Sequence, residues 1–144
     1  MQHIATHVDV DAPPAVVWDC LSDLASYPDW NPHVVSATGT LEEGSTLRIR
    51  VRRVGAADRE MTVTVTDVDP ERRLAWVGRL WSPWLFEGRH TFELEPLSGD
   101  RTRLHNREEV SGVLGRFVVT ETPERDYEAM NRAVKERVER ATVT

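Results

Sequence analysis

The feature that most constrains the fold is a long stretch of alternating apolar and polar residues between positions 34 and 112. Leu47, Ile49 and Val51, for example, alternate with arginines. A period of two residues places successive side chains on opposite faces of a β-strand. Further rows of the same kind begin at Met61, Leu74, Phe86 and Leu104. The stretch therefore predicts successive strands, each with one apolar and one charged face.

Short turn signals separate these rows. Glu43-Gly44, Asp69-Pro70 and Ser98-Gly99-Asp100 are examples, and all are rich in residues that favour turns. Strands joined by such short connections pair as hairpins, so the pattern predicts an antiparallel meander. We expect one face of this sheet to be covered and the other to contact water.

Segments with helical periodicity precede and follow the stretch of predicted strands. After a strand predicted over residues 3–10, apolar residues recur at helical spacing from Val17 to Leu24. Segment 27–32 contains two prolines, which disfavour helical geometry in the residues before them, so only a short second helical turn is expected there. Thr122-Pro123-Glu124 is a typical helix start. The helix that follows is predicted to have about 18 residues and a length of roughly 27 Å.

Composition and charge exclude several classes of protein. We expect a single domain over residues 1–144, with hydrophobic residues making up 40% of the sequence. The net charge of −6 argues against nucleic acid as a partner. No apolar stretch approaches the roughly 18 residues of a membrane span, and no signal peptide is visible, so a cytoplasmic protein is expected. Cys20 is the sole cysteine, so we expect no intrachain disulfide and no cysteine-based metal cluster. We also expect no other metal site and no cofactor, because the sequence has no phosphate loop, Gly-rich dinucleotide turn or HExxH motif.

The predicted order is a strand, two short helices, about six more strands and a long terminal helix. Local motifs accompany this order: Ala12-Pro13, Tyr27-Pro28-Asp29-Trp30-Asn31-Pro32, Asp67-Val68-Asp69-Pro70, Gly88-Arg89-His90-Thr91-Phe92-Glu93-Leu94, Glu108-Glu109-Val110-Ser111-Gly112 and Tyr127-Glu128-Ala129-Met130-Asn131. In both respects the chain resembles the START/Bet v 1-like (SRPBCC) superfamily, in its polyketide cyclase/dehydrase-like branch. Members of that superfamily include lipid and hormone carriers and aromatase/cyclases.

The resemblance implies an α+β helix-grip fold. In this fold a curved antiparallel sheet, of about seven strands here, wraps around a long C-terminal helix and leaves an apolar cavity between them. Two short helices follow the first strand. A shared fold does not by itself specify a function, so the function has to be argued from the residues that would line the cavity.

Polar residues interrupt the apolar inner face at three positions, His90, Asn106 and Glu108, and His33 is expected at the cavity mouth. An apolar cavity with a few converging polar groups is typical of a small-molecule site. The predicted ligand contacts are Trp30, His33, Trp76, Trp84, Phe86, His90, Phe92, Asn106, Glu108 and Met130.

His90 and Glu108 are also the candidate catalytic residues. Burial disfavours the charged forms of carboxyl and imidazole groups. Both groups could therefore act as acid and base near neutral pH, in an aldol-type cyclisation or a dehydration. The alternative is a structural pair, in which Glu108 bonds to an arginine or to His90 without chemistry.

The five tryptophans indicate either a thick core or a cavity wall. Trp18 is predicted in the core, whereas Trp30, Trp81 and Trp84 lie in predicted connections and are expected to gather at one end of the cavity. The apolar segment 81–86 fits a lid over the cavity mouth, a homodimer contact or a surface for another protein. The alternative is that it packs onto the terminal helix.

Three function classes follow from the sequence. The first is binding of a small hydrophobic ligand that is aromatic or polycyclic, and polyketide- or lipid-like. The second is a cyclase or dehydratase acting on a polyketide-like substrate through His90 and Glu108. The third is a protein-interaction module that uses the segment 81–86.

Overall fold

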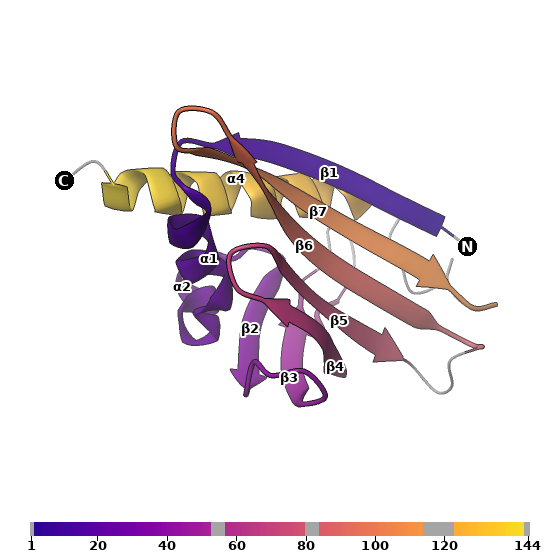
Figure 1. Ribbon diagram of the computed structural model, residues 1–144. Coiled ribbons are helices and arrows are strands. Elements are labelled where there is room, and N and C mark those ends of the chain that lie inside the picture. The colour runs from indigo at the N-terminus through magenta and orange to yellow at the C-terminus, as the bar shows by residue number, and fades with distance from the viewer. Residues whose placement is uncertain (1, 53–56, 80–83, 114–122, 143–144) are drawn as a thin grey trace.

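A curved sheet of seven antiparallel strands forms the framework of the protein, with a long helix on one side of it (Figure 1). The computed structural model describes residues 2–52, 57–79, 84–113 and 123–142. The strand order is β1-β7-β6-β5-β4-β3-β2. In chain order the strands are β1 (Gln2–Val10), β2 (Val34–Gly39), β3 (Thr46–Val51), β4 (Arg59–Asp69), β5 (Arg73–Arg79), β6 (Glu87–Leu97) and β7 (Arg101–Ser111).

The predicted alternation of faces is confirmed. On β6 the side chains of His90, Phe92 and Leu94 are buried, and they are separated by residues that are more exposed. β4 changes its register against β5 between Val65 and Asp67. This bulge adds a residue, so Val65 and Val68 both contact the core although they lie three positions apart.

Three short helical segments follow β1: α1 (Pro14–Ser22), η1 (Leu24–Ser26) and α2 (Tyr27–Trp30). Pro14 stands in the first turn of α1, where its missing N–H costs no hydrogen bond. The inner side of α1 buries Val17, Trp18 and Leu21. Trp18 therefore belongs to the core, as predicted.

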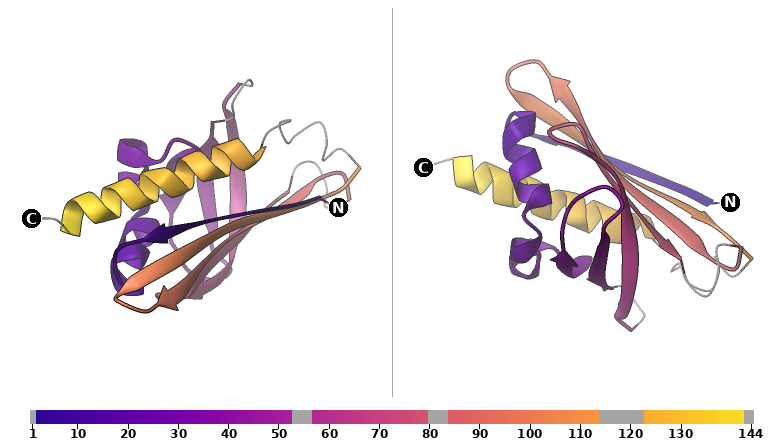
Figure 2. Two further views of the ribbon diagram at one scale, coloured as in Figure 1. Left: turned by 90° about the horizontal axis from the view of Figure 1, so that it is seen from above. Right: turned by 60° about the horizontal axis from the view of Figure 1, so that its bottom comes forward.

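The terminal helix α4 (Pro123–Thr142) has 20 residues, close to the predicted length. Its buried stripe consists of Tyr127, Met130, Val134 and Val138, which follow one another at helical spacing. α4 runs along β1, and α1 and α2 lie near its C-terminal end (Figures 1 and 2). This arrangement confirms the expected helix-grip fold.

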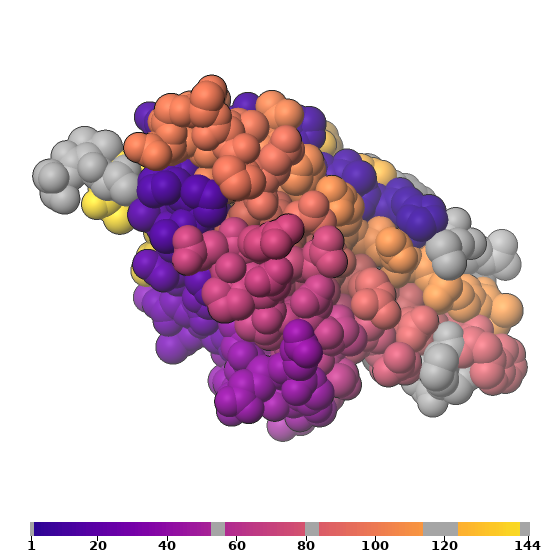
Figure 3. Space-filling view, viewed as in Figure 1, coloured from indigo at the N-terminus to yellow at the C-terminus, as the bar shows by residue number. Residues whose placement is uncertain are grey.

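The outer face of the sheet carries cross-strand ion pairs, and Figure 3 views the molecule from this side. Arg73 on β5 bonds Glu93 on β6 at 3.2 Å, and Arg107 on β7 reaches the same carboxylate at 3.2 Å. Arg48 and Arg50 of β3 are exposed, as the alternating pattern predicts. Because these charged side chains are well hydrated, the outer face of the sheet can contact water while the inner face packs on α4.

Candidate functional site

A buried pair of titratable side chains lies in the middle of the inner face. His90 on β6 and Glu108 on β7 are directly opposite each other in the strand register. His90 Nδ1 lies 2.8 Å from Glu108 Oε2, and the two side chains are only 6% and 14% exposed. The rings of Phe92 and Trp76 pack beside the imidazole, with centroids 4.6 and 5.6 Å from it. The structure thus brings both candidate catalytic residues together inside an apolar wall.

Gly88 provides the space that the Glu108 carboxylate occupies. It lies on β6 two residues before His90, on the same face. A Cβ atom at this position would be 2.8 Å from Glu108 Oε1 and about in contact with the Phe86 ring, at 3.4 Å. The absence of a side chain therefore lets the carboxylate lie flat against the strand.

Hydrogen bonds extend from this pair through three more residues, which lie on β7, α4 and β1. His90 Nε2 lies 2.7 Å from Asn106 Oδ1, and Asn106 Nδ2 donates to Asn131 Oδ1 on α4 at 2.9 Å. Asn131 Nδ2 donates to Thr6 Oγ1 on β1 at 2.9 Å, and Thr6 Oγ1 donates to the backbone oxygen of Asn106 at 3.0 Å. We call these five residues, from Glu108 to Thr6, the polar chain.

Sequence reasoning missed Asn131 and Thr6 as site residues. Both carried a signal: Thr6 is a polar residue at an inner position of the first strand, and Asn131 interrupts the apolar stripe of the terminal helix. What the sequence could not supply is that the two positions, 125 residues apart, meet.

Tyr127 is a further residue of the site, one helical turn before Asn131. Its ring lies edge-on to His90 at 5.3 Å and edge-on to His33 at 5.0 Å. Burial, the largest cause, raises the pKa of Tyr127 well above its ordinary value, and the charges of Glu108 and Asp126 add to this effect. The phenol therefore keeps its proton.

His33 is fixed close to this cluster by the turn that follows α2. Asn31 Oδ1 accepts hydrogen bonds from the backbone N–H groups of His33 and Val34, at 3.0 and 2.9 Å. His33 Nδ1 lies 2.9 Å from the backbone oxygen of Arg52. Since a carbonyl oxygen only accepts, Nδ1 of His33 carries a proton.

The apolar residues predicted as ligand contacts divide into two groups. Trp76, Phe86, Phe92 and Met130 are buried in the core around the polar chain. Trp30 is partly buried and packs on Tyr27 instead, with its indole N–H donating to Ser26 Oγ at 3.2 Å.

Trp84 is 69% exposed and does not reach the polar chain. It lies in the connection between β5 and β6, whereas Trp30 belongs to α2, and these two parts of the chain are at opposite ends of the molecule (Figures 1 and 2). The expected gathering of these two tryptophans at one end is therefore wrong, because the connections that carry them leave the sheet at different ends. Trp81, like the rest of 80–83, lies outside the described residues.

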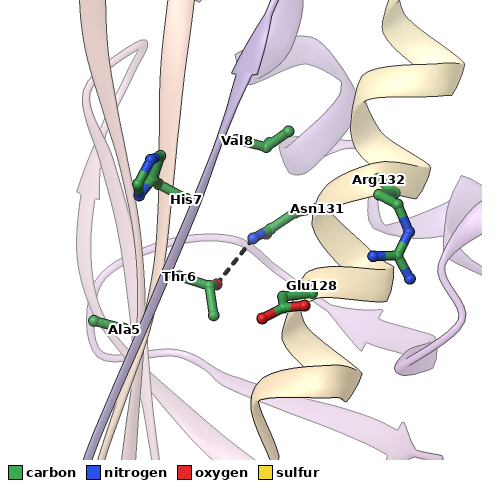
Figure 4. Close-up of a pocket in the computed structure, with 7 residues that line it drawn as sticks. All are labelled: Ala5, Thr6, His7, Val8, Glu128, Asn131 and Arg132. Carbon is green, nitrogen blue, oxygen red and sulfur yellow. Dashed lines mark hydrogen bonds between the residues drawn. The ribbon is translucent and has the colours of Figure 1, made fainter.

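A groove of about 400 Å³ runs between β1 and α4, where the polar chain reaches the edge of the sheet (Figure 4). The hydrogen bond between Thr6 and Asn131 crosses it. The lining residues are Ala5, Thr6, His7, Val8, Glu128, Asn131 and Arg132.

The described residues contain no group of three or more histidine, cysteine or acidic side chains placed to hold a metal ion. Within the same residues, no helix combines the length and apolar character needed to cross a membrane.

Comparison with solved structures identifies relatives of this fold. The Zhui aromatase/cyclase from Streptomyces sp. R1128 is 24% identical, with a TM-score of 0.75 over 96% of this chain and 94% of its own. A START superfamily protein from Mycobacterium smegmatis is 22% identical, with a TM-score of 0.76 over 97% of this chain and 99% of its own. At such identities the likeness establishes the fold alone.

No curated protein matches the chain. The protein family described as "Polyketide cyclase / dehydrase and lipid transport" matches residues 1–140. Because this match spans nearly the whole sequence, the chain belongs to the polyketide cyclase/dehydrase and lipid-transport family.

Proposed function

We propose that the protein binds a small hydrophobic ligand, aromatic or polycyclic, between the inner face of the sheet and α4. The observation that carries this proposal is the buried Glu108–His90–Asn106 segment of the polar chain, which is surrounded by Trp76 and Phe92. Apolar walls supply affinity in small-molecule sites, and a few polar groups fix the orientation of the ligand. Membership of a family that includes lipid transport supports the same function.

The charges around the site favour a ligand without a carboxylate. Among the described residues, the buried polar and charged side chains include no lysine and no arginine. A buried anion needs a cation or several hydrogen-bond donors to offset its loss of hydration. The positive charge of a protonated His90 is already balanced by Glu108, 2.8 Å away. A ketone or phenol is therefore a better match than the head group of a fatty acid.

Isothermal titration with two probes tests this proposal. A neutral dihydroxyanthraquinone should bind saturably, with one molecule per chain, and palmitate should bind more weakly. In the Glu108→Gln variant the preference for the neutral probe should shrink, because a positive charge on His90 is then no longer balanced. An exposed-site control on the same helix, Glu136→Gln, should keep the wild-type preference. Tighter binding of palmitate than of the anthraquinone by the wild type would reject a neutral-ligand site.

A second candidate function is catalysis of cyclisation or dehydration, and the 2.8 Å separation of His90 and Glu108 favours it. The pair could remove a proton from a carbon between two carbonyl groups of a polyketone. That carbon would then bond to a distant carbonyl carbon, and the returned proton would neutralise the resulting alkoxide. Loss of water would complete the dehydration.

Kinetics with a synthetic polyketone separates the two functions. For an enzyme, His90→Gln should lower kcat by the 10²–10⁴-fold that is roughly typical of a lost general acid or base, with a smaller change in KM. A carrier would bind the polyketone without converting it faster than buffer does. Unchanged kcat in both His90→Gln and Glu108→Gln would exclude the catalytic role of the pair.

A further inference from the structure

The polar chain closes on itself at Asn106, and this closure determines the direction of each hydrogen bond. The backbone oxygen of Asn106 can only accept, so the Thr6 hydroxyl donates to it across 3.0 Å. A hydroxyl has a single proton to donate. Thr6 Oγ1 must therefore accept from Asn131, and the atom of Asn131 that faces it at 2.9 Å is the amide nitrogen.

The donor and acceptor roles of Asn131 and Asn106 follow from that of the Thr6 hydroxyl and determine which atom of His90 is protonated. With its nitrogen directed at Thr6, Asn131 presents Oδ1 to the Asn106 side chain, which donates Nδ2 across 2.9 Å. Asn106 then has only Oδ1 left for His90 Nε2, at 2.7 Å. An amide oxygen only accepts, so His90 Nε2 carries a proton in every protonation state that keeps this chain intact.

We propose that Thr6 and Asn131 are positioning residues, which hold the proton on His90 Nε2 and so leave Nδ1 as the ring atom that exchanges a proton with Glu108. One proton then lies between Nδ1 and Glu108 Oε2, which are 2.8 Å apart. It resides either on the imidazole or on the carboxyl, and in both cases the pair has zero net charge. The use of this proton toward a ligand rests on the proposed function.

Burial explains why two residues so far from the pair can control it. Asn106 and Asn131 are 0% and 2% exposed, so both amides depend mainly on partners within the protein. A reversed amide would place two acceptors or two donors against each other, which costs about 1–3 kcal/mol for each buried group left without a partner. The Thr6 hydroxyl therefore acts on His90 through the orientations of two amides.

Nitrogen-15 spectra of the histidine rings in ligand-free protein test this proposal. In the wild type near neutral pH, His90 Nε2 should have the chemical shift of a protonated ring nitrogen. In Thr6→Val, which removes the hydroxyl and keeps the side-chain shape, both amides can turn over. His90 should then show a second population or an averaged shift at Nε2. Thr6→Ser restores the hydroxyl and should restore the wild-type shift.

Thr102→Val is the matched control. The Thr102 hydroxyl is also buried and donates to a backbone oxygen, that of Ala12, at 2.8 Å, and it has no connection to His90 in the polar chain. Its loss should lower stability without moving the His90 signals.

Two results would overturn the proposal. One is a wild-type His90 whose Nε2 carries no proton, a result that needs no variant to fold. The other is a folded Thr6→Val with His90 nitrogen shifts identical to those of the wild type. Both measurements use ligand-free protein, so a failure to bind anthraquinone would reject the proposed function and leave these outcomes unaffected.

Discussion

Gly88 lies on β6 beside the buried His90–Glu108 pair, and its missing side chain leaves the room that the carboxylate fills. Gly78 lies directly opposite on β5, where a Cβ would meet the end of the Met61 side chain at 2.6 Å. The two glycines thus face different neighbours: one a charged group held by hydrogen bonds, the other the flexible tip of a methionine.

Gly88→Ala should therefore disturb the site, whereas Gly78→Ala should be better tolerated. Forcing a methyl group against Glu108 is expected to lower the free energy of unfolding by about 1–3 kcal/mol and to shift the His90 nitrogen signals. Urea denaturation and the histidine spectra measure the two effects. Equal losses in both variants, with unchanged His90 signals, would show that Gly88 has no special relation to the carboxylate.

The reactivity of the Cys20 thiol gives a second prediction at the scale of single residues. Burial, the largest cause, raises the pKa of this thiol from its ordinary value of 9.0 to about 11. The thiolate is the reactive form, so alkylation by iodoacetamide at pH 8 should be much slower in the folded protein than in urea. Equal rates in the two states would contradict the raised pKa.

The same shift determines how stability changes at alkaline pH. Well below pH 9.0 the thiol is protonated in both the folded and the unfolded protein, and the stability that its burial contributes is fully present. As pH rises toward about 11 the unfolded chain ionises first, so the folded state loses stability. Cys20→Ala should remove this part of the alkaline decline in the urea midpoint.

At the scale of elements, α4 has two roles: it completes the core and it delivers Tyr127 and Asn131 to the polar chain. Met130 lies between these two residues in sequence and is fully buried. It therefore belongs to the apolar stripe that fixes how far α4 is rotated about its axis. That rotation also sets where the polar side chains of the helix point.

Met130→Ala should lower the free energy of unfolding by about 2–5 kcal/mol, the range for large-to-small changes in a core. The exposed Arg132→Ala on the same helix should change it by about 0.5 kcal/mol or less. Urea denaturation of both variants checks the difference. A loss for Met130→Ala no greater than that for Arg132→Ala would mean that α4 does not pack on the sheet as described.

The sequence alone predicts contacts between neighbouring strands better than contacts between elements that lie far apart in the chain. His90 and Glu108 could be predicted as neighbours because both fall on the inner face of adjacent hairpin strands, and strand alternation is a local property. Tyr127, Asn131 and Thr6 could not, because helical periodicity identifies the buried stripe of α4 without saying which strand it meets. The Thr6–Asn131 contact joins opposite ends of the chain and exists only in the folded structure.

The locations of tryptophans could be predicted from the sequence in regular elements but not in connections. Trp18 and Trp76 stand in regular elements, and their burial agrees with the periodicity of those elements. Trp30 and Trp84 stand in or beside connections, and nothing in the local pattern states at which end of the sheet a connection emerges. Their separation depends on the strand order of the whole sheet.

At the scale of the whole molecule, the location of a ligand beside His90 is tested most directly through the indole N–H signals of the five tryptophans. Nitrogen-15 spectra are recorded while the dihydroxyanthraquinone is added. The signal of Trp76, whose ring lies 5.6 Å from that of His90, should shift saturably, and the signal of the 69% exposed Trp84 should stay in place. Movement of Trp84 with a constant Trp76 signal would instead place the ligand at the exposed Trp84 and contradict an inner site.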